Sequence, residues 1–181
     1  MLKSKLRKKL LYLRRKKNNQ NIKFSYSKIF KEINKYNLKN KLIGGYYPIN
    51  FEINVLDFLH SLEKRGKKIC LPSIKENNEM DFYLWSFNES LHLSKYGIPE
   101  PKKVTKVVPD IILVPIVAFD KKLYRIGYGG GYYDRYFEKF SNKKDFLKIG
   151  IAYSFQKINK VPINKFDKKL DIIITEKNIL K

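Results

Sequence analysis

The chain has 181 residues, of which 43% are hydrophobic, and its 39 basic and 17 acidic residues give it a formal net charge of +22. This length and apolar content predict one domain, residues 1–181, with a hydrophobic core of its own. The single cysteine excludes an intramolecular disulfide and fits a reducing, cytoplasmic location, and the longest apolar run, residues 111–119, is far too short to cross a membrane.

The opening segment is expected to be an amphipathic helix, because leucines recur at helical spacing over residues 2–13. Lys3, Arg7 and Arg14 fall at offsets of four and eleven residues, which places all three on one side of that helix. These cations form either a solvated basic face or a face that binds an anionic ligand.

Helices and strands are expected to alternate along the rest of the chain. We expect helices at residues 27–36 and 50–65, and strands at residues 42–47, 68–71, 80–87, 110–114, 148–153 and 170–175. This alternation, with apolar strands covered on both faces, predicts an α/β protein with a single-domain, three-layer α/β/α fold and a mostly parallel sheet. Ligands bind such sheets beyond the carboxyl ends of the strands, where Tyr47, Asp120 and a glycine-rich segment are expected.

The glycine-rich segment, RIGYGGGYYDR at residues 125–135, carries the clearest chemical signal. Its four glycines within five positions allow positive φ, and successive backbone N–H groups in such a turn can hold anionic oxygens. A helix expected to begin near Tyr132 would point its positive end at the same place. Arg125 is suited to phosphate and Asp134 to a phosphate-bound Mg²⁺. The segment therefore indicates a nucleotide-phosphate site, and the alternative is an ordinary glycine-rich turn.

Two other glycine loops are excluded by their spacing. A Walker loop requires Lys-Ser/Thr after its last glycine, and none follows here. The dinucleotide fingerprint requires a small residue at its sixth position, which is Tyr132 when counted from Gly127.

Together with LVPIVAFD at residues 113–120, the segment resembles the signature of the 5-formyltetrahydrofolate cyclo-ligases, also called 5,10-methenyltetrahydrofolate synthetases. The resemblance continues in order along the chain at Lys3-x3-Arg7, Tyr47-Pro48 followed by Glu52, GIPEP at residues 97–101, and Val161-Pro162 followed by Asp167 and Asp171. The chain departs from the family pattern at Leu123, where a glycine is usual, and at Asn54, where an acidic residue is common.

The resemblance implies an ATP- and Mg²⁺-dependent enzyme that converts 5-formyltetrahydrofolate and ATP to 5,10-methenyltetrahydrofolate, ADP and phosphate. It implies that Arg125 and Asp134 are catalytic, that Asp134 and Asp167 hold Mg²⁺, and that Asp171 is a weaker candidate. It further implies ATP contacts from Lys3, Arg7, Arg125, Gly127, Tyr128, Gly129, Gly130, Gly131, Tyr132 and Tyr133. Substrate contacts are implied for Tyr47 and Glu52. Tyr128 is a further candidate substrate contact because its ring offers stacking surface, and the alternative is that it packs the loop.

Several alternatives remain at this point. Without the resemblance, Tyr47 is equally well a core aromatic residue and Glu52 an acid in the first turn of a helix. The charge alone suggests a nucleic-acid-binding protein, but only six of the basic residues are arginines, and Lys, Asn, Ile, Tyr and Phe share A/T-rich codons. A different ATP-using enzyme on the same scaffold is also consistent with the loop. We expect a monomer with no specific nucleic-acid or membrane partner.

Overall fold

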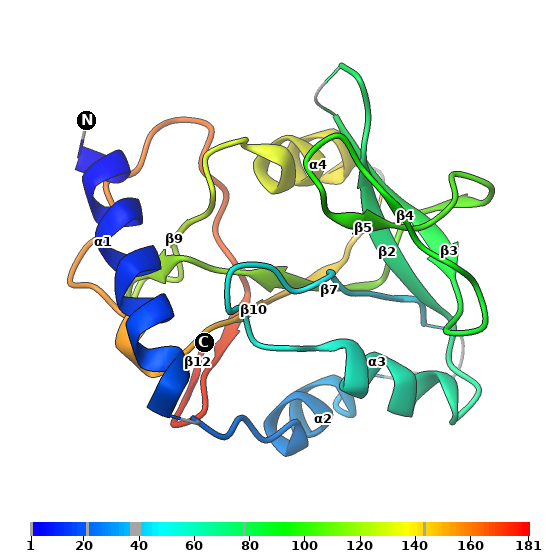
Figure 1. The fold of residues 1–181 in the computed structure, drawn as a ribbon, viewed down its shortest axis with the longest axis horizontal. Helices are drawn as coiled ribbons and strands as arrows, with labels where there is room; N and C mark the ends of the chain where they lie inside the picture. Colours follow the sequence, from blue (N-terminus) through cyan, green and yellow to red (C-terminus); the bar gives the residue numbers. More distant parts are fainter. Residues whose placement is uncertain (1, 21, 37–40, 78, 143) are drawn as a thin grey trace.

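The computed structural model describes residues 2–20, 22–36, 41–77, 79–142 and 144–181. An eight-stranded sheet in the order β12-β11-β10-β7-β1-β2-β3-β6 runs through its centre (Figure 1). Its strands are β1 (Ile43–Gly44), β2 (Ile69–Ile74), β3 (Met80–Trp85), β6 (Lys106–Val107), β7 (Ile111–Pro115), β10 (Leu147–Ile151), β11 (Ile172–Ile174) and β12 (Ile179–Leu180). The five strands from β11 to β2 are parallel, and β12, β3 and β6 pair antiparallel at the edges, which confirms the predicted mostly parallel sheet.

Helices cover both faces of the sheet. The described helices are α1 (Leu2–Lys17), α2 (Ser27–Ile33), α3 (Leu56–Glu63) and α4 (Tyr132–Phe140), with short 3₁₀ turns η1 (Asn18–Gln20) and η2 (Ser154–Gln156). Buried side chains of α2 and α3 pack on one face, and those of α4 pack on the other (Figure 1). The three-layer prediction is therefore confirmed, and no described helix is long and apolar enough to span a membrane.

Two short ribbons complete the fold: β4 (His92–Leu93) pairs with β5 (Pro99–Glu100), and β8 (Ala118–Phe119) pairs with β9 (Arg125–Ile126). The buried Asp120 shapes the β8–β9 turn, because its carboxylate accepts hydrogen bonds from the backbone N–H groups of Lys122, Tyr124 and Val161 at 2.9–3.2 Å. Leu123 takes the left-handed conformation in this turn, with φ of 67°, and buries its side chain. The turn therefore keeps a glycine-type backbone although a leucine occupies the position.

Helix α1 packs against the β8–β9 ribbon rather than against the main sheet. Its buried Leu10 joins Val117, Ala118, Ile126 and Val161 in a separate apolar cluster. This packing lays α1 across the side of the molecule at which β9 leads into the glycine-rich segment (Figure 1).

The structure corrects two predicted elements. The strand expected at residues 42–47 is limited to β1, and the chain beyond Gly44 runs on without regular structure. The helix expected from residue 50 begins only at Leu56, because Asn50 and Phe51 have φ values of 48° and 61°, which no right-handed helix accommodates. Glu52 consequently lies in a loop, and the alternative of a first-turn helix acid is wrong.

Candidate active site

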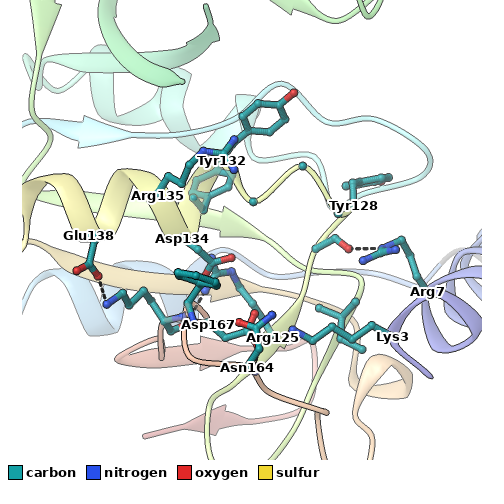
Figure 2. A pocket seen from close by; sticks show the side chains of 18 of the residues that line it. Lys3, Arg7, Arg125, Tyr128, Tyr132, Asp134, Arg135, Glu138, Asn164 and Asp167 are labelled. Carbon is teal, nitrogen blue, oxygen red and sulfur yellow. Dashed lines mark hydrogen bonds and ion pairs between the residues drawn. The ribbon is translucent and has the colours of Figure 1, made fainter. Parts of the chain in front are cut away.

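A cavity of about 900 Å³ lies between α1, the start of α4 and the loop at residues 164–168 (Figure 2). Its described lining residues are Lys3, Arg7, Pro115, Arg125, Ile126, Gly127, Tyr128, Gly129, Gly130, Gly131, Tyr132, Tyr133, Asp134, Arg135, Glu138, Asn164, Lys165, Phe166, Asp167 and Lys168. A cavity of this volume is large enough for a nucleotide together with part of a second substrate. All of the residues predicted for ATP and Mg²⁺ line it.

The glycine loop, residues 127–131, requires glycine for steric as well as conformational reasons. Gly129 and Gly131 have φ values of 109° and 67°, and Gly131 caps α4 at its amino end. A Cβ atom at Gly129 would lie 3.1–3.3 Å from the guanidinium of Arg7, and one at Gly130 would lie 2.3 Å from the ring of Tyr132. The loop therefore brings its backbone close to the cavity and leads directly into a helix amino terminus, which favours an anionic ligand.

Helix α1 supplies two cations to this cavity. The Lys3 Nζ atom lies 2.5 Å from Asp167 Oδ2, and the Arg7 Nε–H donates to the carbonyl oxygen of Gly127 at 2.7 Å (Figure 2). Both contacts join residues more than a hundred positions apart. The predicted basic face of α1 is thus turned toward the glycine loop and is not a solvated surface.

Arg125 is held rigidly from β9. Its side chain is buried, its Nη2 pairs with Asp134 Oδ1 at 2.9 Å, and its Nη1 donates to the carbonyl of Lys168 at 2.7 Å. Burial lowers the pKa of Arg125, and the neighbouring Asp134 opposes that shift. The same Asp134 oxygen accepts the backbone N–H of Lys168 at 3.0 Å. The guanidinium is therefore fixed in a cavity wall before any ligand binds.

Asp134 and Asp167 retain capacity for a divalent cation. In the hydrogen bonds and ion pairs of the described residues, Asp134 uses Oδ1 and Asp167 uses Oδ2, so each carboxylate has a second oxygen for a metal. No group of three or more His, Cys, Asp or Glu side chains suited to a metal occurs in the described part of the chain. Mg²⁺ bound with a nucleotide needs only one or two protein carboxylates, since phosphates and water complete its shell, so this donor set fits.

Glu52 lies near the other end of the glycine loop. Its Oε2 accepts the backbone N–H of Ile49 at 3.0 Å, whereas its Oε1 is buried without a hydrogen-bond partner among the described residues. Burial raises the pKa of Glu52 to about 7, although Arg14 and Tyr128 lower it. A buried, unpaired carboxylate oxygen is an acceptor available to a ligand with N–H donors.

Arg14 connects Glu52 to the glycine loop and was not predicted as a site residue. It is buried, its Nη1 donates to the carbonyl of Ile116 at 3.1 Å, and its Nη2 donates to the hydroxyl of Tyr128. The helical spacing placed Arg14 on the same face as the two other α1 cations, but only the tertiary structure reveals its burial.

The remaining predictions have mixed outcomes. Tyr47 is half-buried and does not line the large cavity, so its predicted substrate contact stays a prediction. Asp171 accepts the backbone N–H of Lys148 at 2.7 Å beside β11. This contact agrees with its prediction as a weaker metal candidate than Asp134 and Asp167. The sequence did not predict five polar lining residues: Arg135, Glu138, Asn164, Lys165 and Lys168. Arg135 and Glu138 could have been found from their position on the first turns of the predicted helix, whereas residues 164–168 carry no comparable pattern.

Comparisons with known proteins show the family to which this chain belongs. A model described as the 5-formyltetrahydrofolate cyclo-ligase family matches residues 1–176. The 5-formyltetrahydrofolate cyclo-ligase of Haemophilus influenzae is 34% identical over 142 residues, covering 74% of this chain and 75% of that protein. The corresponding protein of Mycoplasma genitalium is 37% identical over 135 residues, covering 74% and 72%.

Two solved structures are similar over almost the whole chain. The 5,10-methenyltetrahydrofolate synthetase of Aquifex aeolicus has a TM-score of 0.77 and 34% identity, covering all of this chain and 93% of that one. The 5,10-methenyltetrahydrofolate synthetase of Mycoplasma pneumoniae has a TM-score of 0.73 and 28% identity, covering 97% of this chain and 99% of that one.

Proposed function

Because this chain belongs to the 5-formyltetrahydrofolate cyclo-ligase family and is an enzyme of that class, we propose that it drives ring closure with ATP and Mg²⁺ in the 900 Å³ cavity. The reaction converts 5-formyltetrahydrofolate and ATP to 5,10-methenyltetrahydrofolate, ADP and phosphate. The observation that carries the proposal is that Lys3, Arg7 and Arg125 line one cavity together with a glycine loop that leads into a helix amino terminus. Such an arrangement supports a triphosphate.

The chemical difficulty lies in the formyl oxygen, which is a poor leaving group. In the proposed reaction this oxygen attacks the γ-phosphorus, the bond between the β- and γ-phosphates breaks, and ADP leaves. The folate N10 then attacks the activated carbon, its proton is lost, and the former formyl oxygen departs within phosphate. The protein contributes alignment and charge stabilisation, which are the main sources of rate enhancement in phosphoryl transfer.

Each side chain has a proposed part in that alignment. Arg125 is buried and fixed by Asp134, so it can stabilise charge on the transferring group without reorganising first. Lys3 and Arg7 hold the outer phosphates from α1, and the glycine-loop N–H groups hold the remaining oxygens. Asp134 and Asp167 would hold Mg²⁺, which when bound neutralises the phosphate oxygens.

The folate is proposed to lie at the Tyr128 end of the cavity. Its flat pterin carries several N–H donors, and the unpaired Oε1 of Glu52 is a suitable acceptor for them. Tyr128 offers a ring edge between the two substrates, and Tyr47 remains a proposed contact by resemblance. This arrangement would bring the formyl group toward the glycine loop.

The experiment that tests the proposal measures methenyltetrahydrofolate by its absorbance and ADP by a coupled assay, from 5-formyltetrahydrofolate and MgATP. We expect equal amounts of both products and no ADP when the folate is omitted. The proposed reaction transfers the γ-phosphoryl group to the folate oxygen and not to water, so ATP should not be hydrolysed alone. Rapid ADP release without folate would contradict the proposal, as would methenyltetrahydrofolate formation without ATP.

A further inference from the structure

The outer side of helix α1 carries a row of exposed cations with a tyrosine among them. The exposed residues of this row are Lys5, Lys8, Lys9, Tyr12, Arg15 and Lys16. At 3.6 residues per turn these six positions fall within an arc of about 120° on the helix surface. Figure 1 shows α1 at the periphery of the fold, so this side faces away from the sheet. We call these six residues the basic stripe.

The charge of the basic stripe is not neutralised within the described part of the molecule. Helix α1 contains no acidic residue, and none of the five stripe cations takes part in an ion pair among the described residues. Elsewhere in the fold, by contrast, Lys75 and Lys106 both pair with the buried Asp81. Like charges three or four residues apart, such as Lys5 and Lys9, repel each other on a helix. An anionic partner would relieve this repulsion.

The chemistry of the basic stripe favours a nucleic acid over a membrane or an acidic protein. The leucines of α1, Leu6, Leu10 and Leu13, pack in the cluster at the β8–β9 ribbon, so the helix has no free apolar face to insert into a bilayer. A protein interface needs an apolar centre, and the stripe offers only the ring of Tyr12, which is 66% exposed.

The dimensions of the stripe fit a single strand. From Lys5 to Lys16 the helix rises about 17 Å, which matches about five phosphates of a stacked strand at roughly 3.4 Å each. The Tyr12 ring lies near the middle of the stripe and can stack on a base. In a duplex the base faces are covered by neighbouring pairs, so only the cations could contribute.

We propose that the basic stripe binds single-stranded nucleic acid without sequence preference, a role that does not depend on the proposed reaction. The stripe cations contact phosphates, and Tyr12 stacks on one base. Lys3 and Arg7 lie on the opposite side of the same helix and line the large cavity, so the strand and a nucleotide would occupy separate places.

The test measures the fluorescence anisotropy of a labelled, mixed-sequence single-stranded RNA of about 12 nucleotides, at salt concentrations from about 50 to 200 mM. Tyr12→Ala should weaken binding about 5- to 10-fold, the low end of the range for one base stacked on an aromatic ring, and Tyr12→Phe should restore it. An RNA duplex of the same length should bind the wild type and Tyr12→Ala equally. Excess MgATP should not displace the single strand.

A charge-matched pair of triple variants separates the stripe from the overall charge. The stripe variant replaces three of its lysines by glutamine, and the control does the same at three exposed lysines on other elements; the residues are Lys5, Lys9 and Lys16 in the stripe and Lys31, Lys64 and Lys102 in the control. The stripe variant should lower the slope of log affinity against log salt by about two, because each phosphate contact contributes about 0.7. Its thermal midpoint should be equal to that of the wild type or higher, which shows that it folds.

Four results would overturn the proposal. Equal losses in the two triple variants would indicate diffuse attraction to the net charge, and an unchanged affinity of Tyr12→Ala would remove the stacked base. Displacement of the RNA by MgATP would place the strand in the large cavity. Phosphatidylserine vesicles or polyglutamate that bind as tightly as the RNA, and lose binding in the stripe variant, would identify a membrane or an acidic protein as the partner.

Discussion

Replacing Glu52 by glutamine should stabilise the protein while weakening its folate affinity. Burial raises the pKa of this carboxyl from its ordinary value of 4.5 to about 7, so the folded state binds its proton more tightly than the unfolded state. At about 1.4 kcal/mol per pKa unit, the ionised carboxylate costs the folded protein about 3 kcal/mol above pH 7. This cost declines as the pH falls through 7 and is absent below about 4.5, where both states are protonated.

The measurement is the difference in unfolding free energy between Glu52→Gln and wild type, from urea denaturation at a series of pH values from 8 to 5. We expect the variant to be more stable by up to about 3 kcal/mol at pH 8, with the difference shrinking toward zero as the pH approaches 4.5. Glu76→Gln is the control, because it removes the same charge from an exposed side chain and should change the unfolding free energy little.

The same substitution that stabilises the fold should weaken folate binding. An amide presents N–H groups as well as an oxygen, so Glu52→Gln should raise the folate KM, and the wild-type folate KM should itself rise as the pH falls below 7 and the carboxyl becomes protonated. The reasoning would be refuted by a variant that is less stable than wild type at pH 8, or by a stability difference that does not depend on pH.

Four further predictions concern the large cavity and the overall charge. Arg7→Ala should raise the KM for ATP about 10- to 150-fold and that for folate much less, whereas Lys5→Ala should do little; equal effects would leave Arg7 without a specific role. Gly129→Ala should weaken ATP binding, because its Cβ would contact the Arg7 guanidinium, while Gly66→Ala, also at positive φ but in open space, should lower only the thermal midpoint. Asp134→Asn should raise the Mg²⁺ requirement and lower the unfolding free energy by about 1–3 kcal/mol, since a buried arginine loses its charged partner; unchanged Mg²⁺ dependence would contradict a metal role. Polynucleotide binding measured across a salt titration should be weak, insensitive to sequence and lost steeply as salt rises; tight, selective binding at physiological salt would favour a nucleic-acid function.

Some helices and strands could be predicted because residues close together in the sequence determine them. The apolar run around residues 110–114 is the central strand β7, and the helix expected near Tyr132 begins at that residue, directly after Gly131 in its left-handed conformation. In both places the local residue types favour the observed backbone: branched apolar residues favour a buried strand, and glycine tolerates the left-handed conformation that precedes α4.

The sequence could not predict the surroundings of Glu52. Apolar spacing over residues 50–65 is helical, but Asn50 and Phe51 adopt left-handed conformations and α3 begins only at Leu56. The loop at residues 164–168 enters the cavity through contacts such as that of Asp167 with Lys3, 164 positions away. The periodicity of apolar residues reflects only residues that are close along the chain. Such long-range contacts could therefore be identified only from the family resemblance or from the structure.

The attachment of α1 has a consequence for synthesis on the ribosome. This helix emerges first, yet its cations contact two carbonyls, a hydroxyl and a carboxylate that lie 102–164 positions later in the chain. Through most of translation those cations have no native partners, and long-range closures of this kind are slow to form. The large cavity is therefore among the last parts of the molecule to assemble, and a nascent chain halted before residue 167 would lack the loop that contacts Lys3.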